Sequence, residues 1–237
     1  GSLDDNGYDV QQTDDDGYII AGSTSSFGEG WNDVWLIKTN QDGSLDWDQR
    51  FEAWQGSHSW GFSVQQTRDE GYVIVGHTWA ESAVSIWLIK TDSEGIEQWN
   101  RTFGGVLDDE GYGVQQTDDD GYIITGEIYS NYSTFILLLK TDSDGNEQWS
   151  QIMGNDWDSD NGYNFSDGIG YSVQQTDDGG YIVSGFLNSL GGCLIKTDNI
   201  GNEEWMYIFD DGFSGGTSVQ QTNDGGYIVT GEVYEEG

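Results

Sequence analysis

Residues 114–126 read VQQTDDDGYIITG, and residues 136–149 read ILLLKTDSDGNEQW. Each stretch holds two runs rich in β-branched or aromatic residues, divided by a short turn that contains Asp and Gly. Runs of this kind with an Asp-Gly turn between them are typical of antiparallel β-hairpins. The two stretches therefore predict four consecutive short strands, named A, B, C and D below.

This four-strand unit repeats along the whole chain. The string VQQT begins at Val10, Val64, Val114, Val173 and Val219, and the C–D pattern follows the first four copies. Four strands in about 50 residues correspond to one blade of a β-propeller. We predict an all-β fold in a single β-propeller domain, 1–237, of four-stranded antiparallel blades. Four blades are complete and the fifth is partial; their approximate bounds are 7–53, 61–103, 111–153, 170–209 and, for the partial blade, 216–234.

The incomplete fifth blade leaves three interpretations open. In the first, a five-bladed ring closes with a thin last blade, and in the second, the chain is a fragment of a longer array. In the third interpretation a neighbouring molecule supplies the missing C and D strands, because an exposed strand edge accepts a foreign strand. The third predicts self-association through the fifth blade.

The pattern VQQTxDGGYIxxGxT followed by WLIKTDxxGxxxW resembles a propeller repeat of secreted or surface proteins of bacteria and archaea. It is also distantly similar to PQQ-type propeller repeats, whose third and fourth strands have a comparable ending. The resemblance covers essentially the whole chain and implies an extracellular or cell-surface location. It brings no catalytic residue and no required cofactor, because such repeats are scaffolds.

The charge of the chain excludes some classes of binding partner. Seven basic and 43 acidic side chains give a net charge of −36. Such a surface repels phosphate backbones and anionic headgroups, so we expect no nucleic-acid partner. No apolar run approaches the roughly 20 residues of a spanning helix, so we also expect no membrane insertion. The acidic composition is typical of proteins from high-salt or marine environments.

Residues that are the same in every copy of the repeat are predicted to have a structural role. We expect the paired glutamines of VQQT to bond to neighbouring blades, and the lysine of each C strand to form one ion pair per blade. The recurring tyrosines of strand B and tryptophans of strand D are predicted to be buried in the core between neighbouring blades. Cys193, at a C-strand position held by Trp35 or Trp87 elsewhere, also predicts core.

Positions that vary predict a binding face. The B–C and D–A loops differ between copies, and variable loops on a rigid scaffold commonly carry binding sites. Aromatic side chains among Asn, Asp, Gly and Ser suit stacking on sugar rings or recognition of a protein. The alternative is that these aromatics cover small loop cores. The candidate ligand-binding residues are Trp31, Trp54, Trp60, Trp79, Tyr129, Tyr132, Trp157 and Tyr163.

The longest D–A loop has the oxygen ligands that Ca²⁺ prefers. They occupy places 1, 3, 5, 9 and 12 of a twelve-residue stretch, the spacing of a wrapped calcium loop. Asn161 stands where such loops have Gly, so a calcium site and a solvated acidic loop both remain open. The candidate metal ligands are Asp156, Asp158, Asp160, Asn164 and Asp167.

Signals of catalysis are weak. The chain has two histidines, His58 and His77, too few for a histidine-rich zinc site. We predict a non-enzymatic binding or adhesion module that recognises glycans or a surface protein through its variable loops. The alternatives are a structural subunit of a surface layer or filament, assembled by blade completion, and a propeller glycosidase or lyase.

Overall fold

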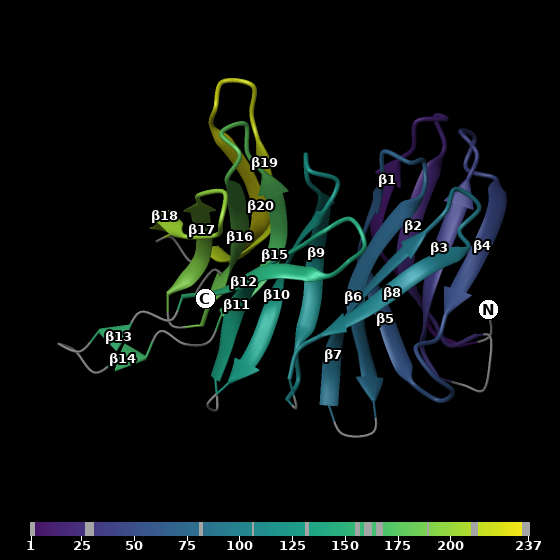
Figure 1. The fold of residues 1–237 in the computed structure, drawn as a ribbon, viewed down its shortest axis with the longest axis horizontal. Coiled ribbons are helices and arrows are strands. Elements are labelled where there is room, and N and C mark those ends of the chain that lie inside the picture. The colour runs from purple at the N-terminus through teal and green to yellow at the C-terminus, as the bar shows by residue number, and fades with distance from the viewer. Residues whose placement is uncertain are drawn as a thin grey trace. The chain divides into compact units, whose positions relative to one another are not determined.

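The computed structural model describes residues 3–26, 31–80, 83–105, 107–130, 133–154, 157–158, 163–164, 168–188, 190–209 and 213–233 (Figure 1). The secondary structure of these residues is entirely β-strand and turn, and none of them forms a helix suited to crossing a membrane. The chain divides into two compact units, residues 1–116 and 117–237.

The first unit contains two complete blades and one further strand. Strands follow chain order within each antiparallel sheet, β1 to β4 and β5 to β8. The strands are β1 (Asp5–Gln12), β2 (Tyr18–Thr24), β3 (Asp33–Thr39), β4 (Leu45–Phe51), β5 (His58–Gln66), β6 (Tyr72–Ala80), β7 (Ala83–Thr91), β8 (Glu97–Phe103) and β9 (Glu110–Gln116).

The second unit continues the pattern. Strands β10 to β12 and β15 to β18 again pair in chain order, whereas β19 and β20 form a sheet of two strands. The strands are β10 (Tyr122–Ser130), β11 (Ser133–Thr141), β12 (Glu147–Met153), β13 (Trp157–Asp158), β14 (Tyr163–Asn164), β15 (Gly168–Gln175), β16 (Tyr181–Leu187), β17 (Gly191–Thr197), β18 (Glu203–Ile208), β19 (Phe213–Gln221) and β20 (Tyr227–Val233). The predicted all-β fold of propeller blades with a partial fifth blade is confirmed.

The VQQT glutamines join neighbouring blades, as expected from their repetition. The Gln66 backbone N–H donates to Oε1 of Gln11 at 2.7 Å, and the Asp14 N–H donates to Oε1 of Gln66 at 2.9 Å. In the second unit the Gln221 N–H donates to Oε1 of Gln174 at 2.6 Å. Each glutamine pair thus satisfies backbone donors that would otherwise lack a partner where two blades meet.

Each C-strand lysine forms the predicted ion pair. Its partner is the aspartate two residues after the VQQT threonine, for example Asp69, whose Oδ2 lies 2.9 Å from Nζ of Lys90. The lysine also donates to a backbone carbonyl, that of Thr91 in this blade at 2.7 Å. The equivalent pairs are Lys38–Asp15, Lys140–Asp119 and Lys196–Asp178. The buried lysine therefore locks the A–B turn onto strand C.

The core lies between the blades. Trp47 of the first blade meets Tyr72 of the second, with ring centroids 5.8 Å apart, and Trp149 and Tyr181 make the same contact in the second unit. Cys193 is fully buried in a cluster with Ile136 and Leu138, as its place in the repeat predicted.

Candidate functional site

Trp60 and Trp79 lie on strands of the second blade, whereas the sequence placed them in loops. Strand pairing between β6 and β7 continues through Trp79↔Val84 to Ala80↔Ala83, so residues 81–82 alone are left for the connection. Trp60 likewise belongs to β5. The alternation of side chains along these ends matches a pleated strand, with Thr78 fully buried beside exposed Trp79. The prediction of loop positions for Trp60 and Trp79 was therefore wrong.

These strand ends carry one continuous row of rings. His58 and Trp60 occupy alternate positions of β5 and share one side of it, because successive side chains of a strand point to opposite faces. Phe62, two residues further on, reaches the same rings through its contact with His77. On β6, Trp79 pairs with His58 and His77 pairs with Trp60. With Trp31 at the outer end, the set is called the aromatic row: Trp31, His58, Trp60, Phe62, His77 and Trp79.

The outer end of the row is open to solvent. Trp31 is 46% exposed and Trp79 is 52% exposed. The His58 ring contacts both, with centroid distances of 4.5 Å to Trp31 and 5.6 Å to Trp79. His58 also stacks on Trp60 at 5.9 Å with an interplanar angle of 12°. Two exposed indoles are thus supported by one shared ring.

The inner end of the row meets a carboxylate. The His77 ring lies between Trp60 and Phe62, with centroid distances of 4.8 and 5.2 Å. Its Nδ1 lies 3.1 Å from Oε2 of Glu110, and the same oxygen accepts a hydrogen bond from the Tyr112 hydroxyl at 2.6 Å. Burial by itself raises the pKa of Glu110, but the His77 and Tyr112 contacts outweigh burial and hold this pKa below its usual value.

A β-bulge determines the direction of one side chain of the aromatic row, that of Phe62. The β1–β2 and β5–β6 registers shift between Gly7 and Asp9 and between Gly61 and Ser63, which leaves Tyr8 and Phe62 as bulge residues. A bulge turns its side chain away from the regular pleat. Tyr8 and Phe62 then meet with ring centroids 4.8 Å apart, so the bulges bring rings of two blades together.

The other candidate ligand-binding residues are not members of the aromatic row. Trp54, 41% exposed, lies in the turn that precedes β5. Tyr129 is a half-buried residue of β10, where it pairs with Thr134, rather than a loop residue. Tyr132 lies outside the described residues. Trp157 and Tyr163 belong to the β13–β14 pair, and their side chains are not described.

The calcium prediction stays a prediction. Asp158 and Asn164 lie in β13 and β14, and Asp158 pairs with Tyr163 there. Asp156, Asp160 and Asp167 lie outside the described residues. Within the segments that the structure describes, no group of three or more acidic, His or Cys side chains is arranged to hold a metal ion.

Sequence reasoning missed Tyr8, Phe62, Tyr112 and Glu110. A repeated signal was available for three of them, because an aromatic residue follows a glycine at the start of strand A in Gly7-Tyr8, Gly61-Phe62 and Gly111-Tyr112. The same pattern occurs at Gly170-Tyr171. Glu110 has no counterpart in the repeat, and only its distance to His77 identifies it.

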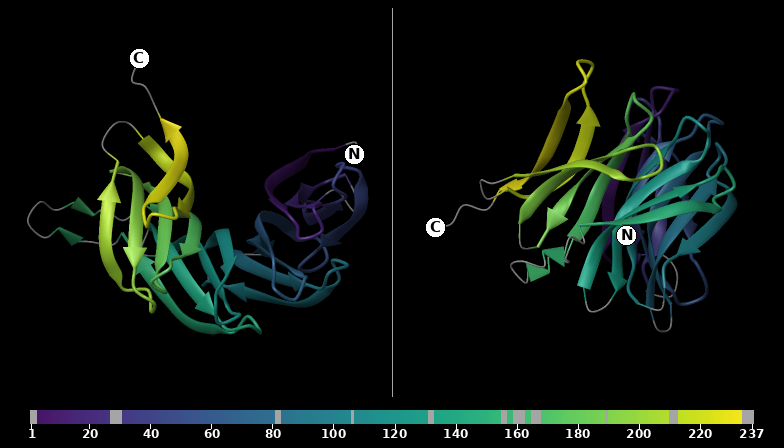
Figure 2. Two further views of the ribbon diagram at one scale, coloured as in Figure 1. Left: turned by 90° about the horizontal axis from the view of Figure 1, so that it is seen from above. Right: turned by 60° about the vertical axis from the view of Figure 1, so that its left-hand side comes forward.

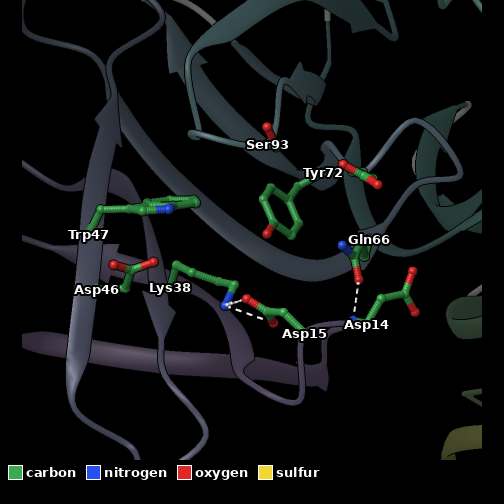
Figure 3. Close-up of a pocket in the computed structure, with 9 residues that line it drawn as sticks. Asp14, Asp15, Lys38, Asp46, Trp47, Gln66, Tyr72 and Ser93 are labelled. Atoms are coloured by element: carbon green, nitrogen blue, oxygen red, sulfur yellow. Dashed lines mark hydrogen bonds and ion pairs between the residues drawn. The ribbon is translucent and has the colours of Figure 1, made fainter.

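The cavity in Figure 3 belongs to the scaffold. It measures about 330 Å³ and lies where the first two blades meet, with Trp47 and Tyr72 facing it. The dashed contacts are the Lys38–Asp15 ion pair and the Asp14–Gln66 hydrogen bond, which recur at other blade junctions. Because both contacts recur in other copies of the repeat, we assign them to the scaffold and assign no ligand to this cavity.

A second hollow, of about 310 Å³, is lined by acidic and polar side chains of the first blade, including Asp33, Glu52 and Arg50. Burial raises the pKa of Asp33 to about 6, and the nearby Glu52 charge adds to the rise, against a smaller opposite effect of Arg50. The raised pKa increases the protonated fraction of the Asp33 carboxyl group at mildly acidic pH.

Comparison with known proteins supports the fold alone. No family model and no curated protein matches the chain. The chain is similar to a protein of unknown function from Bacteroides caccae (TM-score 0.53, 16% identity), with 86% of this chain and 62% of that chain covered. It is also similar to a GH43 glycoside hydrolase engineered to display endo-xylanase and exo-arabinofuranosidase activity (TM-score 0.44, 11% identity), with 90% and 44% covered.

The chain thus spans about three fifths of the first solved structure and less than half of the second. At 16% identity the first likeness shows a shared fold and nothing about activity. The likeness to the GH43 enzyme is too distant to carry an argument.

Proposed function

We propose that the protein is a non-enzymatic carbohydrate-binding module of a secreted or surface protein, and that the outer end of the aromatic row is its binding surface. One observation carries this proposal: Trp31 and Trp79, both about half exposed, are supported by the same His58 ring. Exposed indoles present flat apolar faces, which suit the apolar C–H face of a sugar ring.

The supporting strands favour a preformed site. Trp79 and His58 are cross-strand partners on β6 and β5, and His58 stacks on the half-buried Trp60. Side chains held in this way lose little conformational freedom when a ligand binds, which favours affinity for a weakly interacting ligand such as a sugar.

The charge of the chain selects among sugars. A net charge of −36 disfavours the approach of uronic acids and sulfated glycans at moderate salt. The proposed ligand is therefore a neutral oligosaccharide. A surface protein with a neutral or basic patch is the second type of partner that the same aromatic surface suits.

The test is calorimetric titration of a panel of neutral oligosaccharides, with uronate oligomers as a charged comparison. Trp79→Ala and Trp31→Ala should each weaken binding of a neutral ligand about tenfold or more, because each removes a stacking face. Trp54→Ala is the matched control, since Trp54 is similarly exposed but lies outside the aromatic row. Equal losses for all three variants, or no saturable binding by any neutral ligand, would exclude this surface.

Glycoside hydrolysis is a second candidate, favoured by the raised pKa of Asp33 in its hollow beside Glu52. A protonated carboxyl group near a charged one is the pair that glycoside hydrolysis needs. Release of reducing sugar that is abolished by both Asp33→Asn and Glu52→Gln would support it. Turnover that survives either substitution, or no turnover on any substrate, would exclude it.

A further inference from the structure

The aromatic row stays partly open to solvent behind its exposed tryptophans. His58, Trp60 and Phe62 are half-buried, and only His77 beneath them is fully inside the buried class. Trp60 and Phe62 both contact the His77 ring, with centroid distances of 4.8 and 5.2 Å. The outer binding surface proposed above is therefore one end of a longer aromatic surface and not an isolated platform.

This aromatic surface continues onto strand β9. β9 packs against β5 and β6 (Figure 2, blue to teal). Tyr112 of β9 lies with its ring centroid 5.3 Å from that of Phe62, and it is half-buried as Phe62 is. The ring contacts thus run without a break from the exposed indoles to Tyr112, through His58, Trp60, His77 and Phe62.

A carboxylate lies beside the inner end of this surface. Oε2 of Glu110 accepts a hydrogen bond from the Tyr112 hydroxyl and lies 3.1 Å from Nδ1 of His77. Both contacts use Oε2, so Oε1 has no partner among the described residues, and the side chain is 26% exposed. A carboxylate oxygen held beside an aromatic ring suits a sugar, because it accepts hydrogen bonds from hydroxyl groups while the ring covers the apolar C–H face.

We propose that Phe62, Tyr112 and Glu110 form a second sugar subsite, and that the ligand is a linear neutral oligosaccharide long enough to reach both ends of the aromatic surface. This inference rests on the proposed function, because the outer end must bind sugar. His58 and Phe62 are four residues apart on β5, about 13 Å along the strand, which a single sugar residue does not span. The charge of Glu110 disfavours an acidic sugar at the inner subsite.

The test is the dependence of affinity on ligand length, measured by calorimetry with linear gluco-, xylo- and manno-oligosaccharides from disaccharide to hexasaccharide. In a series that binds, the hexasaccharide should bind about tenfold or more tightly than the disaccharide, because its second contact forms within one complex. Equal affinity of the two lengths would overturn the second subsite and leave the outer surface in place. No saturable binding at any length would exclude the proposed function itself, and the second subsite with it.

Two variants locate the second subsite. Glu110→Gln and Tyr112→Ala should each weaken the hexasaccharide about tenfold and change the disaccharide by less than about twofold, because only the longer ligand reaches them. Trp79→Ala should weaken both ligands, since both use the outer end. Glu94→Gln, in an exposed turn of the second blade, is the charge-matched control and should change neither affinity. Equal losses for the two lengths in Glu110→Gln would indicate a purely structural role and would overturn the proposal.

Nuclear magnetic resonance of the wild-type protein gives a readout that depends on no variant. The hexasaccharide should shift the signals of the Tyr112 ring and the His77 imidazole, because both lie at the inner end. The disaccharide should shift those of Trp31 and Trp79 and leave the Tyr112 ring unchanged. Hexasaccharide shifts confined to Trp31 and Trp79 would show that the ligand stays at the outer end, and would overturn the proposal.

Discussion

The Nδ1 atom of His77 lies 3.1 Å from Oε2 of Glu110, and this contact joins strand β6 to strand β9. Both side chains are largely buried, and Nδ1 has no hydrogen-bond partner among the described residues. The interaction is therefore a charge–charge contact when the imidazole is protonated. It fixes the inner end of the aromatic row across two blades.

This contact predicts a dependence of stability on acid. A carboxyl group whose pKa is lowered by folding stabilises the folded state above its unfolded pKa, and this contribution is lost as the pH falls through the folded pKa. For Glu110 the loss should begin below the usual value of 4.5. Urea titrations between pH 7 and pH 3 should show a smaller acid-dependent loss for Glu110→Gln than for the wild type. Parallel curves for the two proteins would contradict the role assigned to Glu110.

The buried lysines should be essential for stability. Lys90→Met leaves Asp69 and the Thr91 carbonyl without their cation, so the free energy of unfolding should fall by about 1–3 kcal/mol. Arg101→Met removes the same charge from a partly exposed side chain, which donates to the Asn100 carbonyl and lies over the Trp99 ring. Urea denaturation of both variants checks the prediction, which fails if the arginine variant is equally destabilised.

The whole chain should be most stable at mildly acidic pH. At low salt, protonation of some of the 43 acidic residues relieves self-repulsion, so stability should rise as the pH falls from 7 towards about 4.5. Hydrogen bonds from Lys38 and Thr13 lower the pKa of Asp15 to about 2, and those from Thr176 and the Gly180 N–H do the same for Asp178. The stability that these two carboxylates contribute is fully present above pH 3.8, the ordinary pKa of an aspartate. It is lost as the pH falls towards 2.

Thermal unfolding across this range is the measurement. In ~0.5 M salt the rise between pH 7 and pH 4.5 should flatten, because salt screens the repulsion between exposed charges. The loss below pH 3.8 should persist, since it arises from short-range contacts. A maximum of stability at neutral pH and low salt would contradict this account.

The A–B turns offer a matched pair of opposite substitutions. Glu70 has a φ of 66° in the place where the fourth blade has Gly179, with a φ of 84°. Left-handed backbone disfavours a side chain, so Glu70→Gly should stabilise the protein by about 0.5–1 kcal/mol. Gly179→Glu should destabilise it by a similar amount, although open space surrounds that position. Changes of the same sign in the two variants would show that backbone conformation does not control this turn.

Cys193 should be chemically silent in the folded protein. Burial raises the pKa of its thiol to about 12, so almost no thiolate exists at neutral pH. A thiol reagent at pH 8 should label the chain only as fast as the protein unfolds, and labelling should become immediate in denaturant. Rapid labelling without denaturant would mean that β17 opens locally.

The repeat made most of the fold predictable, because each blade encodes the same hairpins, turn residues and contacts between blades. The glutamines of VQQT, the single lysine of each C strand and the Trp–Tyr contacts could be assigned to the scaffold since they recur in every copy. The strand ends at Trp60 and Trp79 could not, because polar and aromatic residues there are compatible with either loop or strand. Only the continued pairing of β6 with β5 and with β7 decided between them.

The sequence by itself determined an all-β chain of propeller blades, a partial fifth blade and an acidic surface, since these depend on local pattern and composition. The tertiary structure alone decided which side chains meet. His58 reaches Trp31 and Trp79, Glu110 reaches His77, and the bulges turn Tyr8 towards Phe62. Such contacts depend on strand register and on the packing of neighbouring blades, which join residues far apart in the chain.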